Sequence, residues 1–368
     1  MTGGVLPDDA RFMRAALALG KDGQGQTWPN PSVGCLIVKG GRVLAGGRTQ
    51  RGGRPHAETV ALEAAGKAAR GATAYVTLEP CAHWGRTPPC AKALVEAGVA
   101  RVVVGCVDPD PRVDGRGLAW LEEGGIEVVT GVLEERAQAA HLGLRRRVLD
   151  GRPMVTLKLA QSLDGRLAAR TGHSQWVTGA AARLEAHRLR ATHDAIMVGS
   201  GTALHDDPRL TCRLPGVLGR DPVRVVVDRR LRLPVTSALA RTAREVPVWV
   251  YTGGDADPGH LEALRALGVE AFPLDDTGLV TVLGRLAARG VTRLLVEGGS
   301  VLAGAFVRQG LVDRLHVAVA PTLIGGDGLP ALAALGLDRV SDAPRFRLVD
   351  EKGLGGDAVR VYEPIGRG

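Results

Sequence analysis

The sequence predicts an α/β protein of two domains, and three observations support this fold class. Short β-branched apolar runs alternate with amphipathic or Ala-rich stretches along most of the chain, as strands and helices do in layered α/β folds. The length of 368 residues favours two domains over one. A hydrophobic content of 45% is ample for two packed cores, and the 51 glycines imply many tight turns.

In the N-terminal half, the predicted helices and strands follow one another in order. A helix is expected over Ala10–Leu19, capped by Pro7-Asp8-Asp9 and stopped by Gly20. Two short apolar runs on either side of Gly40-Gly41 predict a hairpin. The hairpin strands and the elements after them are expected at Val33–Val38, Val43–Ala45, Glu58–Ala69 (helix), Ala74–Leu78, Ala91–Ala97 (helix), Arg101–Cys106, Leu118–Glu123 (helix) and Ile126–Val129.

A charged stretch from Ala137 to Arg152 predicts the domain boundary, so that residues 1–150 form one domain and residues 151–368 the other. The second domain again alternates strands with helices. Its strands are expected at Val155–Leu159, Ala195–Val198, Val223–Val227, Val248–Tyr251, Leu294–Val296 and Leu315–Val319. Its helices are expected at Ala180–Arg190, Leu261–Leu267, Val280–Ala288 and Val301–Gln309.

The formal net charge of +8 has two interpretations, a nucleic-acid binder or an Arg-rich cytoplasmic protein that handles phosphorylated small molecules. The positive charges are scattered, and the densest run is Arg145-Arg146-Arg147. No basic stripe is interleaved with aromatic residues, which are only 3% of the chain. The pattern therefore favours a small-molecule partner.

The five cysteines argue against a disulfide framework because their number is odd and the chain is long. Cys35 and Cys106 lie in apolar runs and are expected in the core. The first residues lack a basic segment followed by an apolar one, and no apolar run approaches the length of a membrane span. We therefore expect a cytoplasmic protein without a membrane partner.

One His and two Cys residues form the pattern that carries most of the chemistry. His56 opens His56-Ala57-Glu58, and Cys81 and Cys90 bound the segment Pro80–Cys90. Three such ligands hold zinc and leave its fourth position open for water, whose pKa zinc lowers from 15.7 to about 7. Glu58 follows the ligand His by two positions and is suited to carry a proton from water to departing ammonia. The pattern predicts hydrolytic deamination of a base-like ring.

A closed zinc knuckle is the structural alternative, and His83 would be its fourth ligand. A second structural alternative is that the two cysteines are buried core residues and the His has no metal-binding role. The order of His-x-Glu, a strand and then Pro-Cys about 25 residues later is the order of zinc deaminases, which favours the catalytic interpretation. The usual spacing in that class is Pro-Cys-x-x-Cys, whereas eight residues separate Cys81 from Cys90 here. The longer loop includes Arg86 and Thr87 and suggests a pocket wall specialised for one substrate.

At this point the chain resembles the bifunctional riboflavin-biosynthesis deaminase/reductase family. Pro80–Cys90 matches the family's P-C-x-H-x-G-R-T-P-P-C, and Pro29–Gly34 matches its P-N-P-x-V-G. The resemblance covers nearly the whole chain and implies a cytidine-deaminase-like α/β/α fold for the first domain. It also implies that Asn30 and His83 contact the pyrimidine ring.

Two positions near this domain depart from the family pattern. Many members have a His seven residues before the ligand His, where this chain has Thr49. Many also have N-x-x-F shortly before the boundary, where His141 and Leu144 stand here. The first departure removes one expected substrate contact, and the second affects how the domains join.

Four segments of the second half suggest a nucleotide or phosphate site. Lys158–Gly165 follows the first strand, Ser174–Gly179 and Asp206–Arg213 come next, and Val296–Ser300 joins a strand to a helix. A Gly-Gly turn at such a junction lets backbone amides approach a phosphate at the helix N-terminus, although glycine pairs there are common. Taken alone, Asp206-Asp207 reads as a polar turn before Pro208. The G-x-G-x-x-G of a Rossmann domain is absent.

All four segments match the reductase half of the same family, which implies a dihydrofolate-reductase-like α/β fold that uses NADPH. By this resemblance, the cofactor contacts are Ala160, Trp176, Thr202, Asp206, Gly299, Ser300, Val301, Leu302, Ala303, Gly304 and Ala305. The substrate contacts are Ser174, Arg190, Leu210, Arg213 and Glu297, to which we add Lys158 as a charge near the reacting centre. Arg190 and Arg213 suit a ribose 5-phosphate because guanidinium forks match phosphate oxygens. Arg229 stands where the family often has Ser and is expected to contact the cofactor near its 2′-phosphate.

The resemblance implies two successive reactions on one phosphorylated pyrimidine. The first domain would remove the 2-amino group of 2,5-diamino-6-(5-phosphoribosylamino)pyrimidin-4-one as ammonia, with Glu58 as proton carrier. The second would reduce the ribosyl group to ribityl with hydride from NADPH. We expect a homo-oligomer that binds no nucleic acid.

Two rival functions remain open at this level. A deaminase acting on tRNA shares the zinc pattern and suits the basic balance, but it does not explain some 200 further residues with cofactor-type segments. A zinc-stabilised binding module without catalysis would tolerate loss of Glu58.

Overall fold

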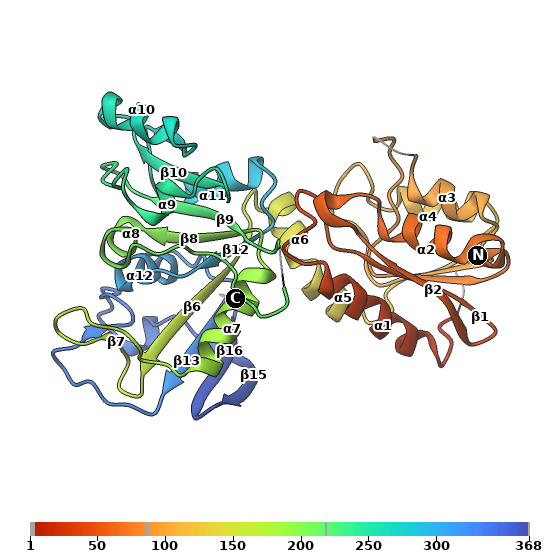
Figure 1. Ribbon diagram of the computed structural model, residues 1–368. Coiled ribbons are helices and arrows are strands. Elements are labelled where there is room, and N and C mark those ends of the chain that lie inside the picture. The colour runs from red at the N-terminus through yellow and green to blue at the C-terminus, as the bar shows by residue number, and fades with distance from the viewer. Residues whose placement is uncertain (1–3, 86–87, 218, 367–368) are drawn as a thin grey trace. The chain divides into compact units, whose positions relative to one another are not determined.

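The computed structural model describes residues 4–85, 88–217 and 219–366, and the chain divides into two compact units (Figure 1). The first unit comprises Met1–Pro153 with Leu286–Thr292, and the second comprises Met154–Arg285 with Arg293–Gly368. The first contains a five-stranded sheet and the second a nine-stranded sheet. The mixed α/β class predicted from the sequence is confirmed.

The first unit is a layered α/β/α structure with strand order β2-β1-β3-β4-β5. β1 pairs antiparallel with β2 and β3, whereas β3, β4 and β5 are parallel. Its strands are β1 (Gly34–Lys39), β2 (Arg42–Arg48), β3 (Thr73–Val76), β4 (Arg101–Val104) and β5 (Glu127–Val129). Its helices are α1 (Asp9–Asp22), η1 (Arg51–Gly53), α2 (Ala57–Ala65), η2 (Gly66–Ala69), α3 (Cys90–Glu96), α4 (Arg116–Glu123), α5 (Glu134–Ala140) and α6 (Leu142–Leu149).

Both faces of this sheet are buried, which explains why its central strands are continuously apolar. Cys35 and Ile37 of β1 point to a core shared with α2, α3 and α4. Leu36 and Val38 point to the opposite core, which α1 covers. Side chains along a strand alternate between faces, so a strand covered on both sides needs apolar residues at every position. Cys35 and Cys106 are both buried, as expected for core cysteines.

The approach of α1 to β1 depends on a glycine. A Cβ at Gly34 would lie 1.9 Å from the carbonyl oxygen of Ala16, so no side chain fits at this strand position. The prediction that the first helix stops at Gly20 is wrong, because α1 continues to Asp22. Gly20 instead lies inside the helix, where a Cβ would meet the backbone of Gly34 at 3.1 Å. Glycine permits this close helix–strand contact here, and does not end the helix.

A buried ion pair joins α1 to β4. The guanidinium of Arg101 donates to both carboxylate oxygens of Asp9 at 2.8 and 2.9 Å, and the Tyr75 hydroxyl donates to the same carboxylate at 2.9 Å. Asp9 is fully buried and Arg101 nearly so. Burial by itself would raise the pKa of Asp9, but the hydrogen bonds from Arg101, Leu6 and Tyr75 outweigh it and lower the pKa.

We expect D9N to destabilise the first unit by about 3 kcal/mol, because Arg101 would keep its buried charge without its main partner. The folded-state pKa of Asp9 lies below its unfolded value, so the pair stabilises the fold above that unfolded value, about 3.9, and the contribution is lost as the pH falls through the folded pKa. Urea unfolding of both proteins from pH 7 to pH 3 measures the difference. An undiminished gap at pH 3 would contradict this account.

The second unit has strand order β11-β10-β9-β8-β12-β6-β13-β16-β15, with a separate pair β14-β7. Neighbouring strands from β11 to β13 are parallel, and β16 pairs antiparallel with both β13 and β15. Its strands are β6 (Met154–Ser162), β7 (Arg166–Ala168), β8 (Ala195–Gly199), β9 (Val223–Val227), β10 (Val248–Gly253), β11 (Glu270–Leu274), β12 (Arg293–Val296), β13 (Arg314–Ala320), β14 (Leu329–Pro330), β15 (Phe346–Leu354) and β16 (Asp357–Pro364). Its helices are α7 (Ala180–Ala191), α8 (Ser200–Asp206), α9 (Ala238–Arg241), α10 (Pro258–Ala266), α11 (Leu279–Ala288), α12 (Ser300–Arg308) and η3 (Val340–Asp342).

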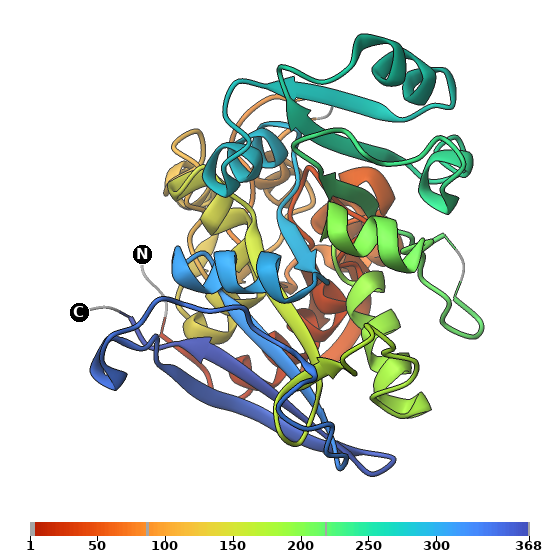
Figure 2. The ribbon, with the colours of Figure 1, turned by 90° about the vertical axis from the view of Figure 1, so that its left-hand side faces the viewer.

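The parallel strands place several chain segments along one edge of this sheet. β11 lies at one end of the sheet and the C-terminal hairpin β15–β16 at the other (Figure 2). In the middle, β9, β8, β12 and β6 are parallel neighbours, so their carboxyl ends lie together. In open parallel sheets this edge is where ligands bind.

Several elements of the second unit were not predicted from the sequence. These are β7, α8, α9, β11, β14, η3, β15 and β16. β15 is exposed along most of its length, so its residues do not show the apolar alternation of a half-buried strand. In the described part of the chain, no helix combines the length and apolarity needed to cross a bilayer.

Candidate active sites

The three predicted zinc ligands come from three separate segments of the first unit. His56 is the residue immediately before α2, and Cys90 is the first residue of α3, one position before the helix start expected from the sequence. Cys81 follows β3 by five residues. Their positions at helix starts and after a strand's carboxyl end bring them to the same edge of the sheet.

The donor atoms of these residues converge. His56 Nδ1 lies 3.3 Å from Cys90 Sγ and 3.7 Å from Cys81 Sγ, and all three atoms lie within 4.8 Å of one another. Tetrahedral zinc, with bonds of about 2.3 Å to sulfur and about 2.0 Å to nitrogen, separates such ligands by about 3.5 Å. The donor set and its spacing therefore fit zinc. Among the described residues His83 does not belong to this group of donors.

The environment of Cys81 favours the thiolate that zinc requires. The backbone N–H of Cys90 donates to Cys81 Sγ at 3.3 Å. The Cys90 thiol and His56 also donate to this sulfur, and together these hydrogen bonds lower the pKa of Cys81 to about 4 despite burial. A thiolate at neutral pH is the form that binds a metal ion.

Glu58 lies in the first turn of α2 and is buried beside the ligands without being one of them. Burial raises the pKa of Glu58 to about 7, the charge of His56 opposes this, and the Cys81 sulfur adds to it. A carboxyl group in such a position can exchange a proton with a ligand near neutral pH.

The two predicted pyrimidine contacts, Asn30 and His83, differ in their hydrogen bonding. Asn30 donates from Nδ2 to the carbonyl of Gly53, three residues before His56, at 2.9 Å. His83 Nδ1 is buried and has no hydrogen-bond partner among the described residues. Thr49, at the position that departs from the family, is buried and accepts a hydrogen bond from the backbone N–H of Val33 at 3.0 Å.

The long loop between the two cysteines is only partly described. Arg86 and Thr87, which the sequence suggested as part of a specialised pocket wall, lie outside the described residues. Trp84 is 65% exposed, and the ammonium of Lys92 lies 5.1 Å from the centre of its ring. The loop therefore presents an aromatic side chain on its surface.

Sequence reasoning missed Glu79, which organises the surroundings of Cys81. Its buried carboxylate accepts hydrogen bonds from four backbone N–H groups, those of Asp108, Gly115, Gly117 and Leu118, at 2.9 to 3.4 Å. These groups lie in the segment that leads into α4 and at the start of that helix. Asp108 is itself buried, which raises its pKa to about 6. An acidic residue before Pro-Cys was the only signal in the sequence.

The position that departs from the family's N-x-x-F is also structural here. His141 is buried, and its Nε2 lies 3.1 Å from Thr77 Oγ1. Thr77 Oγ1 in turn accepts a hydrogen bond from the backbone N–H of Gly34 at 3.1 Å. His141 therefore ties α5 and α6 to the central strands of the first unit.

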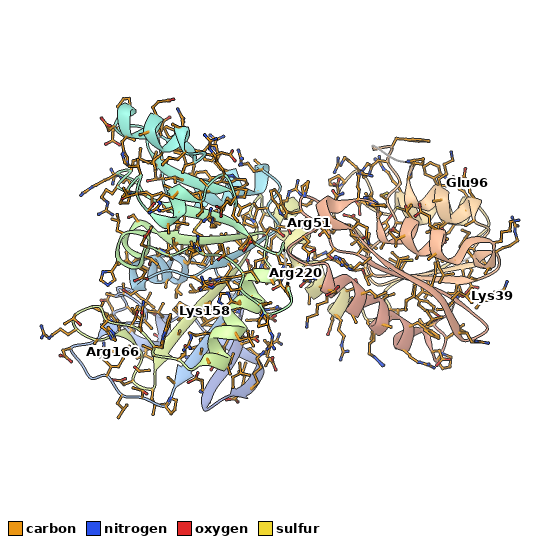
Figure 3. All side chains as sticks on the ribbon, viewed as in Figure 1. Lys39, Arg51, Glu96, Lys158, Arg166 and Arg220 are labelled. Atoms are coloured by element: carbon orange, nitrogen blue, oxygen red, sulfur yellow. The ribbon has the colours of Figure 1, made fainter. Side chains whose placement is uncertain are left out.

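A buried charge cluster marks the centre of the second unit. Arg190 of α7 donates to both carboxylate oxygens of Glu297 at 2.8 and 2.9 Å. Burial would raise the pKa of Glu297, but the charges of Arg190 and Lys158 outweigh it and lower the pKa to about 2. Burial lowers the pKa of Lys158, a residue of β6 in the interior of this unit (Figure 3). Three of the predicted substrate contacts, Lys158, Arg190 and Glu297, therefore form one electrostatic cluster.

Predicted cofactor contacts come from the carboxyl ends of neighbouring parallel strands. Thr202 follows β8, and its hydroxyl accepts a hydrogen bond from the backbone N–H of Gly299 at 3.1 Å. Gly299 is the residue before α12, so the first amides of a nine-residue helix lie beside Thr202. Ala160 lies near the end of β6. This arrangement fits a phosphate-bearing cofactor, because helix N-termini favour negative charge.

The remaining residues of the predicted cofactor stretch differ in exposure. Val301 is 74% exposed, whereas Ala303 is fully buried against the core. Gly304 is also buried, and a Cβ there would approach Ala333 at 3.3 Å. Ser300, Leu302 and Ala305 are half-buried.

The segment before α7 carries an exposed aromatic side chain. Trp176 is 68% exposed, and the guanidinium of Arg183 lies 4.6 Å from the centre of its ring. Ser174 is half-buried, and its carbonyl accepts the backbone N–H of Val177 at 2.9 Å. Asp206 is the last residue of α8, so the polar-turn interpretation of Asp206-Asp207 applies only to its second residue.

Arg229 lines a pocket of about 360 Å³ beyond the carboxyl ends of β9, β10 and β11. The other lining residues are Gly253, Gly254, Asp255, Leu274, Asp275 and Thr277. The carbonyl of Arg229 accepts the backbone N–H of Gly253 at 2.9 Å, which joins two neighbouring strand ends. Its side chain is therefore placed on the same sheet edge as the other predicted cofactor contacts.

Two family descriptions match the chain. Residues 6–106 match the cytidine and deoxycytidylate deaminase zinc-binding region, and residues 153–359 match the RibD C-terminal domain. The three converging ligands lie within the first of these ranges. The charge cluster and the predicted cofactor contacts lie within the second.

Curated relatives are similar over almost their full length. The riboflavin biosynthesis protein RibD of Bacillus amyloliquefaciens is 42% identical, over 94% of this chain and 94% of that protein. The protein of the same name from Escherichia coli is 41% identical, over 95% of this chain and 97% of that protein.

Solved structures show the same architecture. Acinetobacter baumannii RibD superposes with a TM-score of 0.89 and 39% identity, covering 98% of this chain and 99% of that one. A diaminohydroxyphosphoribosylaminopyrimidine deaminase/5-amino-6-(5-phosphoribosylamino)uracil reductase from Thermotoga maritima superposes with a TM-score of 0.85 and 36% identity, over 97% and 99% of the two chains.

Proposed function

The chain belongs to the RibD family of bifunctional riboflavin-biosynthesis enzymes, and we propose that its two halves divide the reactions. Residues 1–150 would act as the zinc-dependent pyrimidine deaminase and residues 151–368 as the NADPH-dependent reductase. The observation that carries this assignment is the convergence of His56, Cys81 and Cys90 beside buried Glu58, in a chain whose other half matches the reductase family.

In the deaminase half, His56, Cys81 and Cys90 would hold zinc. When bound, zinc acts as a Lewis acid that lowers the pKa of water to about 7. The carboxylate of Glu58 would take a proton from the attacking water and deliver it to the departing amine, as a new C–O bond forms at the ring carbon and the C–N bond breaks to release ammonia. Asn30 and His83 would orient the pyrimidine ring. The unpartnered Nδ1 of His83 supports that role.

In the reductase half, Lys158 and Glu297 would contact the sugar that is reduced. NADPH supplies the hydride for the C1 carbon of the opened ribosyl group. Thr202 and the start of α12 would bind the cofactor, together with Ala160, Trp176, Asp206 and Arg229. Ser174, Leu210 and Arg213 would contact the substrate. The position of Ala160, Thr202, Arg229 and the start of α12 near the carboxyl ends of parallel strands supports the cofactor part of this proposal.

The two activities are separable in one assay. We expect purified, zinc-loaded protein to release ammonia from the diaminopyrimidine phosphate without NADPH. When NADPH is then added, the deaminated product should be reduced and NADPH oxidised. Ammonia is measured by a coupled assay and NADPH by its absorbance. Failure of the zinc-loaded protein to release ammonia would exclude the deaminase assignment, whatever the second half does.

The oligomeric state, the cellular location and the partners of the enzyme are also proposed here. We propose a homo-oligomer, a cytoplasmic location and no nucleic-acid partner. The five cysteines are free thiols in the structure, which suits a reducing compartment. Light scattering after gel filtration measures the assembly. An electrophoretic shift with tRNA that survives competitor RNA at physiological salt would favour a tRNA-directed deaminase.

A further inference from the structure

The segment Arg209–Arg213 has no regular secondary structure, yet side chains from other elements hold its backbone. The carbonyl of Arg209 accepts from Arg224 at 3.2 Å, and the carbonyl of Thr211 accepts from Arg190 at 3.0 Å. The N–H of Cys212 donates to Asp221 at 2.6 Å. We call Arg209–Arg213 the anchored segment.

His187 of α7 supplies the last of these anchors. Its Nδ1 accepts the backbone N–H of Arg213 at 3.1 Å, so the ring proton of the neutral imidazole must lie on Nε2. The His187 carbonyl also accepts from the Cys212 thiol at 3.5 Å. Two adjacent residues of the anchored segment therefore attach to one residue of a rigid helix.

The surroundings of His187 keep its imidazole in the form that can accept this bond. Burial lowers the pKa of His187, and so do the charges of Arg190 on its own helix and Arg213 in the anchored segment. The charge of Glu297 and a hydrogen bond with the backbone of Thr211 oppose them without reversing the direction. A protonated imidazole would present N–H groups at both nitrogens and could not accept from Arg213. The bond is therefore intact at neutral pH.

The two arginines predicted to bind phosphate differ in what their side chains already do. Arg190 uses its fork on Glu297 and a further N–H on the carbonyl of Thr211. Arg213 is exposed, and its guanidinium has no hydrogen-bond or ion-pair partner among the described residues. Arg213 is therefore the arginine whose charge is available to an anion.

We propose that His187 is a positioning residue, which fixes the backbone of Arg213 so that its guanidinium meets the phosphate of the substrate. The inference rests on the proposed function, in which Arg213 contacts a phosphorylated substrate. A long side chain on an irregular segment would otherwise lose conformational freedom on binding. Anchoring the backbone in advance removes part of this loss of conformational freedom. The phosphate is remote from the carbon that is reduced, so its contact stabilises the bound substrate and the transition state equally.

The test compares reductase kinetics of H187A, H187N and R213A in the full chain. We expect H187A to raise the KM for the phosphorylated substrate about tenfold with kcat nearly unchanged, as for loss of one hydrogen bond in uniform binding. Asn places an acceptor oxygen near the position of Nδ1, so H187N should restore most of the affinity. R213A should raise KM by about 30-fold or more.

His260 provides the matched control. Its imidazole also bonds the backbone, at the carbonyl of Leu233, but it lies on α10. H260A should leave the reductase KM unchanged. Ammonia release and the unfolding midpoint, measured on every variant, report whether the protein is folded.

The double variant H187A/R213A decides whether His187 acts through Arg213. Since the role of His187 ends at that guanidinium, the double variant should have the KM of R213A alone. If R213A raises KM but H187A does not, or if their effects multiply, the positioning role is wrong and the proposed function stands. If R213A leaves KM unchanged, the phosphate assignment fails and the inference fails with it.

Discussion

Replacing Glu58 with glutamine is expected to lower ammonia release by about 10³-fold, because the amide cannot carry a proton from water to the departing amine. The zinc content should not change, since Glu58 is outside the ligand group. Reduction of separately supplied deaminated substrate with NADPH should proceed at the rate of the parent enzyme, because Glu58 and the reductase residues belong to different units. Metal analysis and the two activity assays measure these outcomes on one preparation.

Two further variants make the Glu58 result specific. Glu63 is exposed on the same helix, so E63Q should retain full deamination. C81S should lose both zinc and ammonia release, because it removes one of the three proposed ligands. Substantial turnover in zinc-loaded E58Q would exclude the proton-carrier role and favour a zinc site that serves binding or stability.

Replacing Glu297 with glutamine should have the second large effect, the loss of reduction with deamination retained. The change leaves Arg190 and Lys158 without the carboxylate that balances their buried charges. We expect NADPH oxidation to fall at least 100-fold and the second unit to lose about 3 kcal/mol of stability. Stopped-flow or steady-state NADPH absorbance and urea unfolding measure the two parts.

The stability effect has a defined pH dependence. The folded-state pKa of Glu297 is about 2, below its unfolded value of about 4.3. Its contribution is therefore full above the unfolded value and is lost as the pH falls through the folded one, so the gap between parent and E297Q should narrow below about pH 4.

Control variants separate charge balance from catalysis. Glu363 pairs with Arg314 at 2.7 Å in the same unit but is partly exposed, so E363Q should cost less than about 1 kcal/mol and keep activity. The double variant R190M/E297Q removes one of the two cations left unbalanced and should recover part of the stability but none of the reduction. Unchanged NADPH oxidation in E297Q would show that Glu297 serves the fold alone.

Elements with a strong local pattern could be predicted from the sequence. The hairpin of β1 and β2 followed from two apolar runs around Gly40-Gly41, and the register confirms that turn. A helix at Ala91–Ala97 was also predicted, and α3 spans Cys90–Glu96. In each case the residues that define the element are its own neighbours, so propensity and turn chemistry suffice.

Elements whose character comes from their surroundings could not be predicted in this way. Gly20 was predicted to end α1, but the helix passes through it, and the glycine permits the close contact with Gly34. β15 and β16 carry mixed polar sequences, and pairing makes them strands, because β16 pairs with β13 and β15 pairs with β16. A local reading has no access to a partner strand or to a packed backbone.

The sequence alone determined the chemistry of this protein. The spacing of His56, Glu58, Cys81 and Cys90 predicts a zinc deaminase, because the ability to bind zinc or to carry a proton is a property of the side chains themselves. The tertiary structure decided which of the two predicted phosphate-binding arginines is already paired within the protein and which can bind an anion. Arg190 and Glu297 are 107 positions apart, and their pairing leaves Arg213 as the available cation. Hydrogen bonds and charges act over a few ångströms, so contacts between distant positions follow from the fold and cannot be read from spacing.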